Sequence, residues 1–123
     1  MKEDWYPELS YSLIGLAYDV FNQLGYGYHE KYYQRAYAQE LTAKELPFKK
    51  EQLVKIQYNG QSIGRYFMDF VIDDKVVVEW KVASEFYGKH IKQVLAYLRA
   101  TNLHLGLIIL CAKEGIRIKR IAN

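Results

Sequence analysis

The chain has 123 residues, half of them hydrophobic and a quarter charged, a composition typical of a globular domain rather than a disordered or fibrous protein. Seventeen lysines and arginines against fourteen acidic residues give a net charge of +3, which permits a polyanionic partner without requiring one. The single cysteine, Cys111, excludes a disulfide framework, so we expect one domain over residues 1–123 in a reducing cytoplasm.

The first residues, MKEDWYPELS, are acidic and aromatic where a signal peptide would be basic and then apolar. No apolar run approaches the roughly 20 residues that a transmembrane helix needs. We therefore expect a cytoplasmic protein without a membrane partner.

Two helices are expected in the first part of the chain. Between residues 7 and 24, apolar residues recur every three or four positions, the spacing of an amphipathic helix. Pro7 suits the first turn of that helix, and Gly25 stands where a left-handed residue would end it. A second helix is predicted over 29–45, and Pro47 stops it.

From residue 52 the pattern alternates and predicts strands. An antiparallel meander is expected, with Asn59-Gly60 as a tight hairpin turn. Its three strands cover 52–58, 63–72 and 76–82.

Helical spacing returns in residues 87–101. The apolar run 103–110 then predicts a strand buried on both faces, and 115–121 predicts a short last strand. The expected order is ααβββαββ, an α/β (α+β) fold in which helices flank a mixed β-sheet.

Side-chain alternation divides the central hairpin into two faces, because residues two apart in a strand point the same way. A three-residue loop, 73–75, keeps the apolar residues of both strands together and places Asp69 opposite Glu79, with Lys81 beside them on the outer face. The residues then expected to form the core face are Tyr66, Met68, Phe70, Ile72, Val76, Val78, Trp80 and Val82.

Two carboxylates directly opposite each other destabilise a sheet. A shared divalent cation would remove the repulsion, since Mg²⁺ takes one or two carboxylates and completes its shell with water and phosphate oxygens. Such an ion can activate water for attack on a phosphodiester, and a lysine can stabilise the developing charge. A solvated strand face with ordinary surface charges explains the same pattern, so both interpretations stay open on physical grounds.

Other polar residues carry little weight by themselves. Gln93 and Tyr97 share one side of the predicted helix with His90, which is typical of a half-exposed flank. Glu30 lies in the first turn of the second helix, where an acidic residue favours the helix dipole.

Four stretches together resemble the GxxExxY proteins, a group within the PD-(D/E)XK nuclease superfamily. GYHEKYY supplies Gly27, Glu30 and Tyr33, and the middle stretch supplies Asp69 followed by a Glu-x-Lys triplet. The four stretches are GYHEKYY (27–33), YNGQSIGRYFMDFVIDDKVVVEWK (58–81), HIKQVLAYLRATNLHLGLIIL (90–110) and KRI (119–121).

The resemblance implies a restriction-endonuclease-like core and hydrolysis of phosphodiester bonds. It implies that Asp69, Glu79 and Glu30 hold Mg²⁺, with Mn²⁺ as a substitute, and that Lys81 assists catalysis. It also raises Gln93 and Tyr97 from a helix flank to catalytic residues.

Two hypotheses follow from these observations. The first is a metal-dependent nuclease that acts on nucleic acid, DNA rather than RNA. The second is a catalytically inactive nuclease-fold module that binds nucleic acid or a protein partner. Exposed aromatic residues are consistent with a homodimer in either case.

Overall fold

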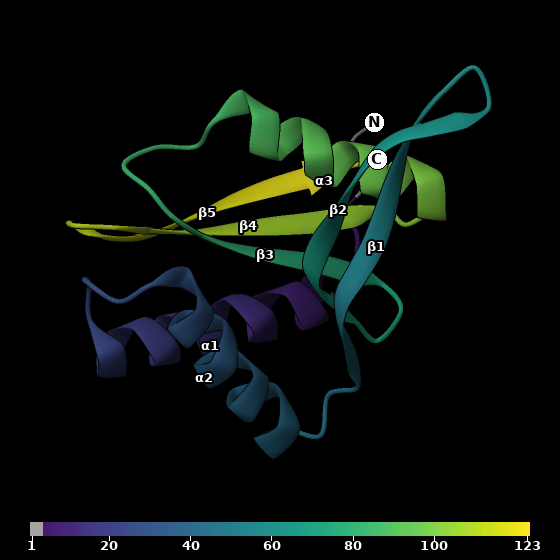
Figure 1. The fold of residues 1–123 in the computed structure, drawn as a ribbon. Helices are drawn as coiled ribbons and strands as arrows, with labels where there is room; N and C mark the ends of the chain where they lie inside the picture. The colour runs from purple at the N-terminus through teal and green to yellow at the C-terminus, as the bar shows by residue number, and fades with distance from the viewer. Residues whose placement is uncertain (1–3) are drawn as a thin grey trace.

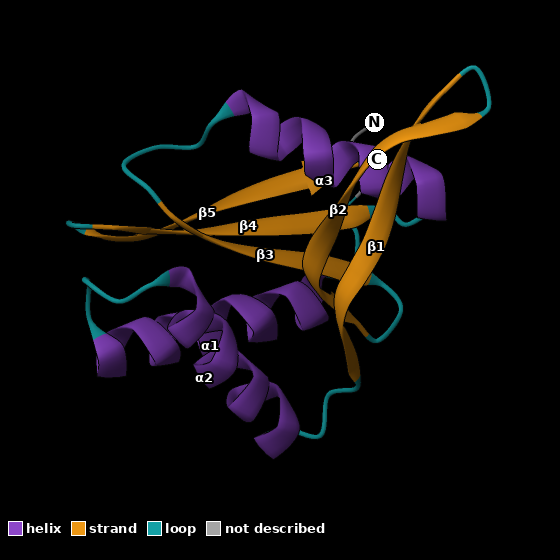
Figure 2. Cartoon of the chain, viewed as in Figure 1, coloured by secondary structure: helices purple, strands orange, loops and turns teal. Residues whose placement is uncertain are grey.

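Residues 4–123 are described by a computed structural model, in which a twisted five-stranded sheet lies between helices (Figures 1 and 2). Helices α1 and α2 lie below the sheet in the view of Figure 1, and α3 lies above it. The elements follow the predicted order and confirm the predicted fold class. They are α1 (Pro7–Leu24), α2 (Glu30–Ala43), β1 (Phe48–Tyr58), β2 (Gln61–Ile72), β3 (Val76–Val82), α3 (Gly88–Thr101), β4 (Leu105–Ala112) and β5 (Gly115–Ala122).

The strands lie in the order β1-β2-β3-β4-β5. Neighbouring strands are antiparallel except β3 and β4, which are parallel and joined through α3. The predicted meander is therefore confirmed for the first three strands. Among residues 4–123, no helix is both long enough and apolar enough to cross a bilayer.

Strand β1 begins at Phe48, earlier than its alternation predicts. The charged run Lys49 to Glu51 conceals its start, because an edge strand exposed to water can carry charges on both faces. Strand β4 begins later than predicted, at Leu105.

Both predicted turns of the meander are present. Asn59 and Gly60 have φ values of 49° and 78°, the left-handed pair that a two-residue hairpin turn of this type requires. The connection Asp73–Lys75 has three residues, and Ile72 pairs with Val76 across it.

A buried aromatic group holds α1 and α2 against the sheet. Trp80 of β3 is fully buried, the Tyr33 ring stacks on it at 5.8 Å, and the Tyr37 ring meets it edge-on at 5.2 Å. The Tyr37 hydroxyl donates a hydrogen bond to the Leu13 carbonyl at 3.0 Å, which ties α2 to α1. The same residues that bury apolar surface thus fix the position of α2 over β3.

A second apolar cluster fills the space under α3. Val77 and Ile108 of the sheet pack there with Val94 and Leu98 of the helix. The face of β3 that carries Val77 is therefore covered, whereas the sequence predicted an outer face of mixed character.

The predicted core face of β2 is wrong for its first two members. Tyr66 and Met68 pack in the cluster under α3, whereas Phe70 and Ile72 pack with α1 and α2. The alternation is interrupted at Asp69, where neither Asp69 nor Glu51 of β1 is paired in the ladder. Glu51 has a φ of 54°, so β1 bends at the same level.

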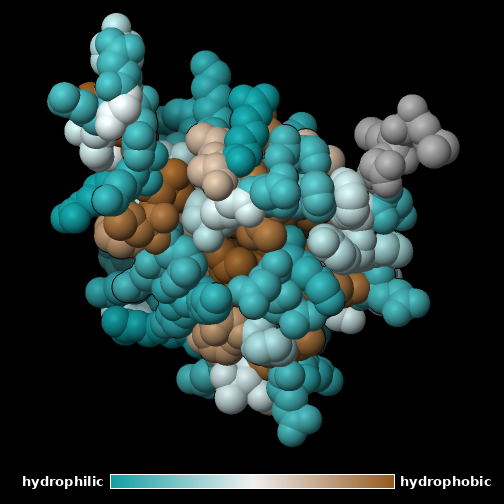
Figure 3. All heavy atoms as spheres, turned by 90° about the vertical axis from the view of Figure 1, so that its right-hand side faces the viewer, coloured by the Kyte–Doolittle hydropathy of each residue, from teal (hydrophilic) through white to brown (hydrophobic). Residues whose placement is uncertain are grey.

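Beyond this bend, β1 and β2 form an arm that stands out from the body (Figures 1 and 3). On the side shown in Figure 3, apolar side chains form separate groups framed by polar ones. The exposed apolar residues of the arm are Leu53, Ile56, Tyr58, Ile63 and Phe67. The expected homodimer stays a prediction.

Gly106 allows α3 to approach the sheet closely. A Cβ atom at this position would lie 2.5 Å from Val94 Cγ1, a stiff β-branched side chain. We expect Gly106→Ala to lower the free energy of unfolding by about 1–3 kcal/mol through overpacking. Chemical denaturation measures this change.

Gly88→Ala is the matched control, because no atom lies within 4 Å of its added Cβ. Adding Val94→Ala to Gly106→Ala should cost less than the sum of the two single changes. Equal stability of the Gly106→Ala and Gly88→Ala variants would contradict the close approach.

Candidate active site

The site lies where β2 separates from β3. Their ladder runs from Ile72–Val76 to Phe70–Val78 and ends there. The next residues in that register are Asp69 and Glu79, so the predicted juxtaposition of the two carboxylates is present.

Beyond this point the edge of β3 has no partner strand, and carboxylates take the place of one. Asp69 Oδ2 accepts a hydrogen bond from the Trp80 N–H at 2.8 Å, and Glu30 Oε1 accepts one from the Val82 N–H at 3.1 Å. The Asp69 N–H in turn donates to Glu79 Oε1. Backbone groups that would otherwise be orphaned thus hold three acidic side chains in place.

Glu79 and Lys81 differ from the expected exposed pair. Only 3% of the Glu79 side chain is exposed, because α3 and its preceding loop cover this face of β3. Lys81 Nζ lies 3.6 Å from Glu79 Oε2, and 20% of the Lys81 side chain is exposed. The lysine is therefore the member of the pair that reaches solvent.

Glu30 owes its position to the anchoring of α2. Tyr33, one turn further along the helix, stacks on Trp80, and its hydroxyl donates a hydrogen bond to the Gly25 carbonyl. Gly25 and Gly27 have φ values of 73° and 119°, which favour glycine and bring the chain round to the start of α2. From the start of α2, the Glu30 side chain reaches the free edge of β3.

Burial dominates the electrostatics of the two central acids. It raises the pKa of Asp69 and of Glu79 above their usual range. The Asp69 carboxylate raises the pKa of Glu79 further, Glu30 acts in the same direction on both, and Lys81 opposes these effects. Placing negative charge on both acids at once is therefore unfavourable without an added cation.

The donor set fits a hard divalent cation. Asp69 Oδ2 and Glu79 Oε1 accept backbone hydrogen bonds, whereas Glu79 Oε2 faces a lysine that a cation could replace. Within residues 4–123, no group of three or more His, Cys, Asp and Glu side chains is assembled as a ready metal cage. Two adjacent carboxylates, of which Asp69 borders a pocket, suit Mg²⁺ better than a metal such as zinc, which prefers a closed set of nitrogen and sulfur ligands.

The structure does not bring Gln93 and Tyr97 into contact with the acids. Tyr97 is buried in the apolar cluster under α3, and burial and the Asp74 carboxylate raise its pKa. The Gln93 carbonyl accepts a hydrogen bond from the Tyr66 hydroxyl at 2.8 Å, and its side chain is half-buried. Their catalytic roles stay predictions.

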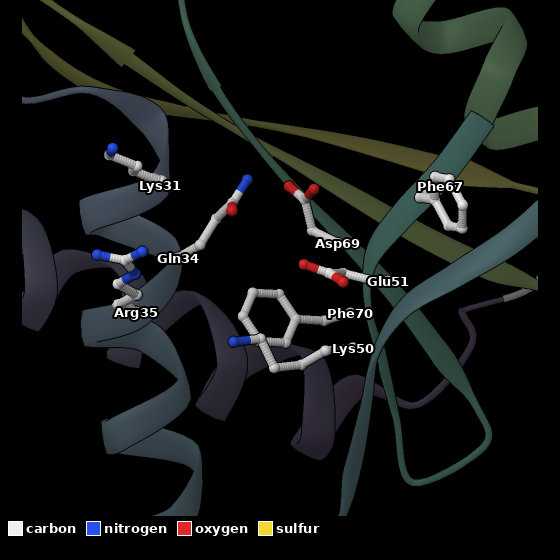
Figure 4. Close-up of a pocket in the computed structure, with 8 residues that line it drawn as sticks. All are labelled: Lys31, Gln34, Arg35, Lys50, Glu51, Phe67, Asp69 and Phe70. Carbon is white, nitrogen blue, oxygen red and sulfur yellow. The ribbon is translucent and has the colours of Figure 1, made fainter.

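Two polar residues near Asp69 were not predicted as site residues. Gln34 lies one turn after Glu30 on the same side of α2, points toward Asp69 in Figure 4, and lowers the pKa of that acid. The four-residue spacing from Glu30 would have indicated it. Glu51 and Asp69 border one pocket, which lies beside α2, but the charged neighbours of Glu51 in the sequence give no sign that β1 bends there.

His90 at the start of α3 also borders the site. Burial and the charges of Lys81 and Lys89 lower its pKa. The first turn of α3 thus lies close enough to Lys81 to experience its charge.

The raised acid pKa values predict a pH-dependent stability. At these two acids the folded chain binds more protons than the unfolded chain, so their contribution to stability is greatest in acid and falls as pH rises from about 4, the unfolded value, through the folded values. We expect Glu79→Gln to raise the melting temperature in EDTA at about pH 8, and the gain to shrink toward about pH 5. Thermal melts followed by circular dichroism test this.

In this comparison the contributions of groups that do not interact with Glu79 cancel, whereas Asp69 still contributes because its charge interacts with Glu79. The glutamine keeps an acceptor oxygen for the Asp69 N–H. A variant that melts below the wild type at alkaline pH would contradict the unfavourable charge of Glu79.

Several solved structures share this fold. The crystal structure of SSO0001 matches with a TM-score of 0.57 at 19% identity, over 76% of this chain and 50% of its own. An alkaline exonuclease (LHK-Exo) from Laribacter hongkongensis matches with a TM-score of 0.51 at 11% identity, over 100% of this chain and 72% of its own. This chain thus spans half the length of the first structure.

No curated protein sequence matches this chain. The narrower resemblance to the GxxExxY proteins stays a prediction. The family model described as the PD-(D/E)XK nuclease superfamily matches residues 7–121, and the chain therefore belongs to that superfamily.

Proposed function

We propose that this protein is a Mg²⁺-dependent nuclease that hydrolyses phosphodiester bonds of nucleic acid, DNA rather than RNA. The observation that carries the proposal is the meeting of Asp69, Glu79 and Lys81 at the separation of β2 from β3. Membership of a nuclease superfamily supports it, and so does the fold shared with an alkaline exonuclease.

Asp69 and Glu79 would hold the cation, and Glu30 would support it from α2. When bound, the cation supplies a water of lowered pKa and neutralises negative charge on the phosphate. Backbone N–H groups hold the Asp69 and Glu30 carboxylates, so these side chains would keep the cation in a fixed position.

Hydrolysis forms a bond from a water oxygen to phosphorus and breaks the bond from phosphorus to the leaving oxygen. The water loses a proton, and the leaving oxygen gains one. Negative charge grows on the phosphoryl oxygens, and the partly exposed Lys81 ammonium lies where it can stabilise that charge. Mn²⁺ should substitute for Mg²⁺ because both accept oxygen ligands.

The second candidate is a catalytically inactive module that binds nucleic acid or a protein partner. An inactive domain would also need the free edge of β3 capped, so the hydrogen bonds of Asp69 and Glu30 to that edge support this candidate as well. Cleavage and metal-binding measurements separate the two candidates.

We expect wild-type protein to cleave DNA with Mg²⁺ or Mn²⁺ and to be inactive in EDTA. Lys81→Ala should lower kcat by about 10²–10³, the usual cost of losing one group that stabilises transition-state charge. Lys113→Ala, an exposed lysine in the turn after β4, is the control. Gel-based assays on single- and double-stranded DNA and RNA measure the cleavage rates. Wild-type protein that cuts none of these substrates would contradict the proposed nuclease activity.

Mg²⁺ should raise the melting temperature of the wild type, because a ligand that binds the folded state stabilises it by about 2.7 kcal/mol at 100 times its Kd. Asp69→Asn should remove most of this gain. Asp19→Asn, an exposed aspartate on α1, should retain it. An equal gain in all three proteins would place the ion elsewhere.

A further inference from the structure

A pocket of about 440 Å³ lies between α2 and the β1–β2 arm, and Asp69 forms part of its wall (Figure 4). It therefore opens directly onto the candidate active site. A cavity of this size is typical of sites for one small ligand. It offers space for one nucleotide unit of a chain, but not for a double helix.

Cationic side chains border this pocket from two elements. Lys31 and Arg35 belong to α2, and the Lys50 side chain reaches from β1 toward α2 (Figure 4). All three are exposed, and within residues 4–123 none of them takes part in an ion pair. Such unpaired cations are suited to the phosphates of a nucleic-acid backbone.

Two acids share the pocket and reduce its positive charge. Glu51 lies near Asp69, and both carboxylates point into the space between the arm and α2 (Figure 4). The three basic side chains outnumber these two acids even without a metal ion, and a metal ion bound at Asp69 would reduce the negative charge further. The net charge of the pocket therefore favours the anionic backbone of a nucleic acid.

An aromatic ring completes the lining. Phe67 lies two residues before Asp69 on β2 and is 51% exposed. The Arg65 guanidinium lies 6.0 Å from the centre of its ring. Singly exposed apolar residues are common on proteins, but an exposed ring beside unpaired cations is the combination on which unpaired bases stack.

We propose that this pocket binds single-stranded nucleic acid, with phosphates at Lys31, Arg35 and Lys50 and one base stacked on Phe67. Paired bases stack on each other and cannot offer a face to the ring, so a duplex would have to open first. The inference rests on the proposed function, since it places the bound strand next to Asp69. The inference extends the proposed function by naming the substrate class, which is single strands or unpaired ends of nucleic acid.

A neighbouring pocket supports a longer path for the strand. Arg35 also borders this second cavity of about 340 Å³, which contains Tyr28 and Tyr32. These rings are 48% and 41% exposed, and Lys31 and Arg35 lie 5.2 and 5.7 Å from the centre of the Tyr32 ring. A strand that passes over α2 would therefore meet further aromatic faces after Arg35.

Fluorescence anisotropy in EDTA tests the proposal without cleavage. The probes are labelled oligo(dT) and oligo(U) of about 20 nucleotides and a DNA duplex of the same length, titrated at several salt concentrations. We expect a single strand to bind more tightly than the duplex. The two single strands then distinguish a DNA from an RNA ligand.

The triple variant Lys31→Ala/Arg35→Ala/Lys50→Ala should reduce the slope of log K against log salt by about 2, which corresponds to three lost phosphate contacts on a single strand. Its matched control removes three exposed cations elsewhere: Lys92→Ala/Arg99→Ala/Lys113→Ala. The control should keep most of the wild-type slope. Thermal melts of both triple variants verify that they fold. The single variant Lys50→Ala should also reduce the slope, by a smaller amount.

Phe67→Ala should weaken single-strand binding by about tenfold, and Phe67→Tyr should restore it because the ring is retained. Equal losses in the two triple variants would overturn the proposal, as would tighter binding of the duplex or unchanged binding by Phe67→Ala. Because no cleavage is needed, the expected binding pattern with no nuclease activity would reject the proposed catalysis and keep the pocket. Cleavage without this binding pattern would reject the proposed pocket and keep the proposed catalysis.

Discussion

The capping of the free edge of β3 by carboxylates is the interaction on which the rest of this site depends. Where β2 leaves β3, the Trp80 and Val82 N–H groups lose a strand partner and bind Asp69 and Glu30 instead. Replacing a strand by side chains satisfies the backbone and at the same time gathers acids from two further elements. A continuous hairpin would have satisfied the same groups without creating a site.

The gathering of acids has an electrostatic cost that folding alone does not require. Glu79 lies in a buried position where a hydrophobic residue would be more stable, and the pKa of Asp69 and Glu79 is raised chiefly by that burial. The aromatic contacts of Trp80 with Tyr33 and Tyr37, on the opposite side of the same strand, offset the cost. Strand β3 thus stabilises the fold on one face and carries a buried acid on the other.

Sequence patterns predicted the element order, both hairpin turns and the register that brings Asp69 to Glu79, because turn chemistry and alternation are local signals. The burial of Glu79 could not be read from its strand, since it depends on how α3 covers the sheet. The bend at Glu51 and Asp69 was also hidden, and it reversed the faces of Met68 and Phe70. A local break in the ladder, with one unpaired residue on each strand, leaves no regular period in a sequence.

The hydrogen bond from Val82 to Glu30 joins residues 52 positions apart and has a consequence for the order of folding. Asp69 and Glu79 belong to one local hairpin, whereas the position of Glu30 beside β3 depends on the packing of α2 on Trp80. Closing so long a loop costs entropy that is recovered only when the aromatic contacts form. A nascent or partly unfolded chain therefore has an incomplete acidic cluster, so the complete arrangement is itself a marker of the native state.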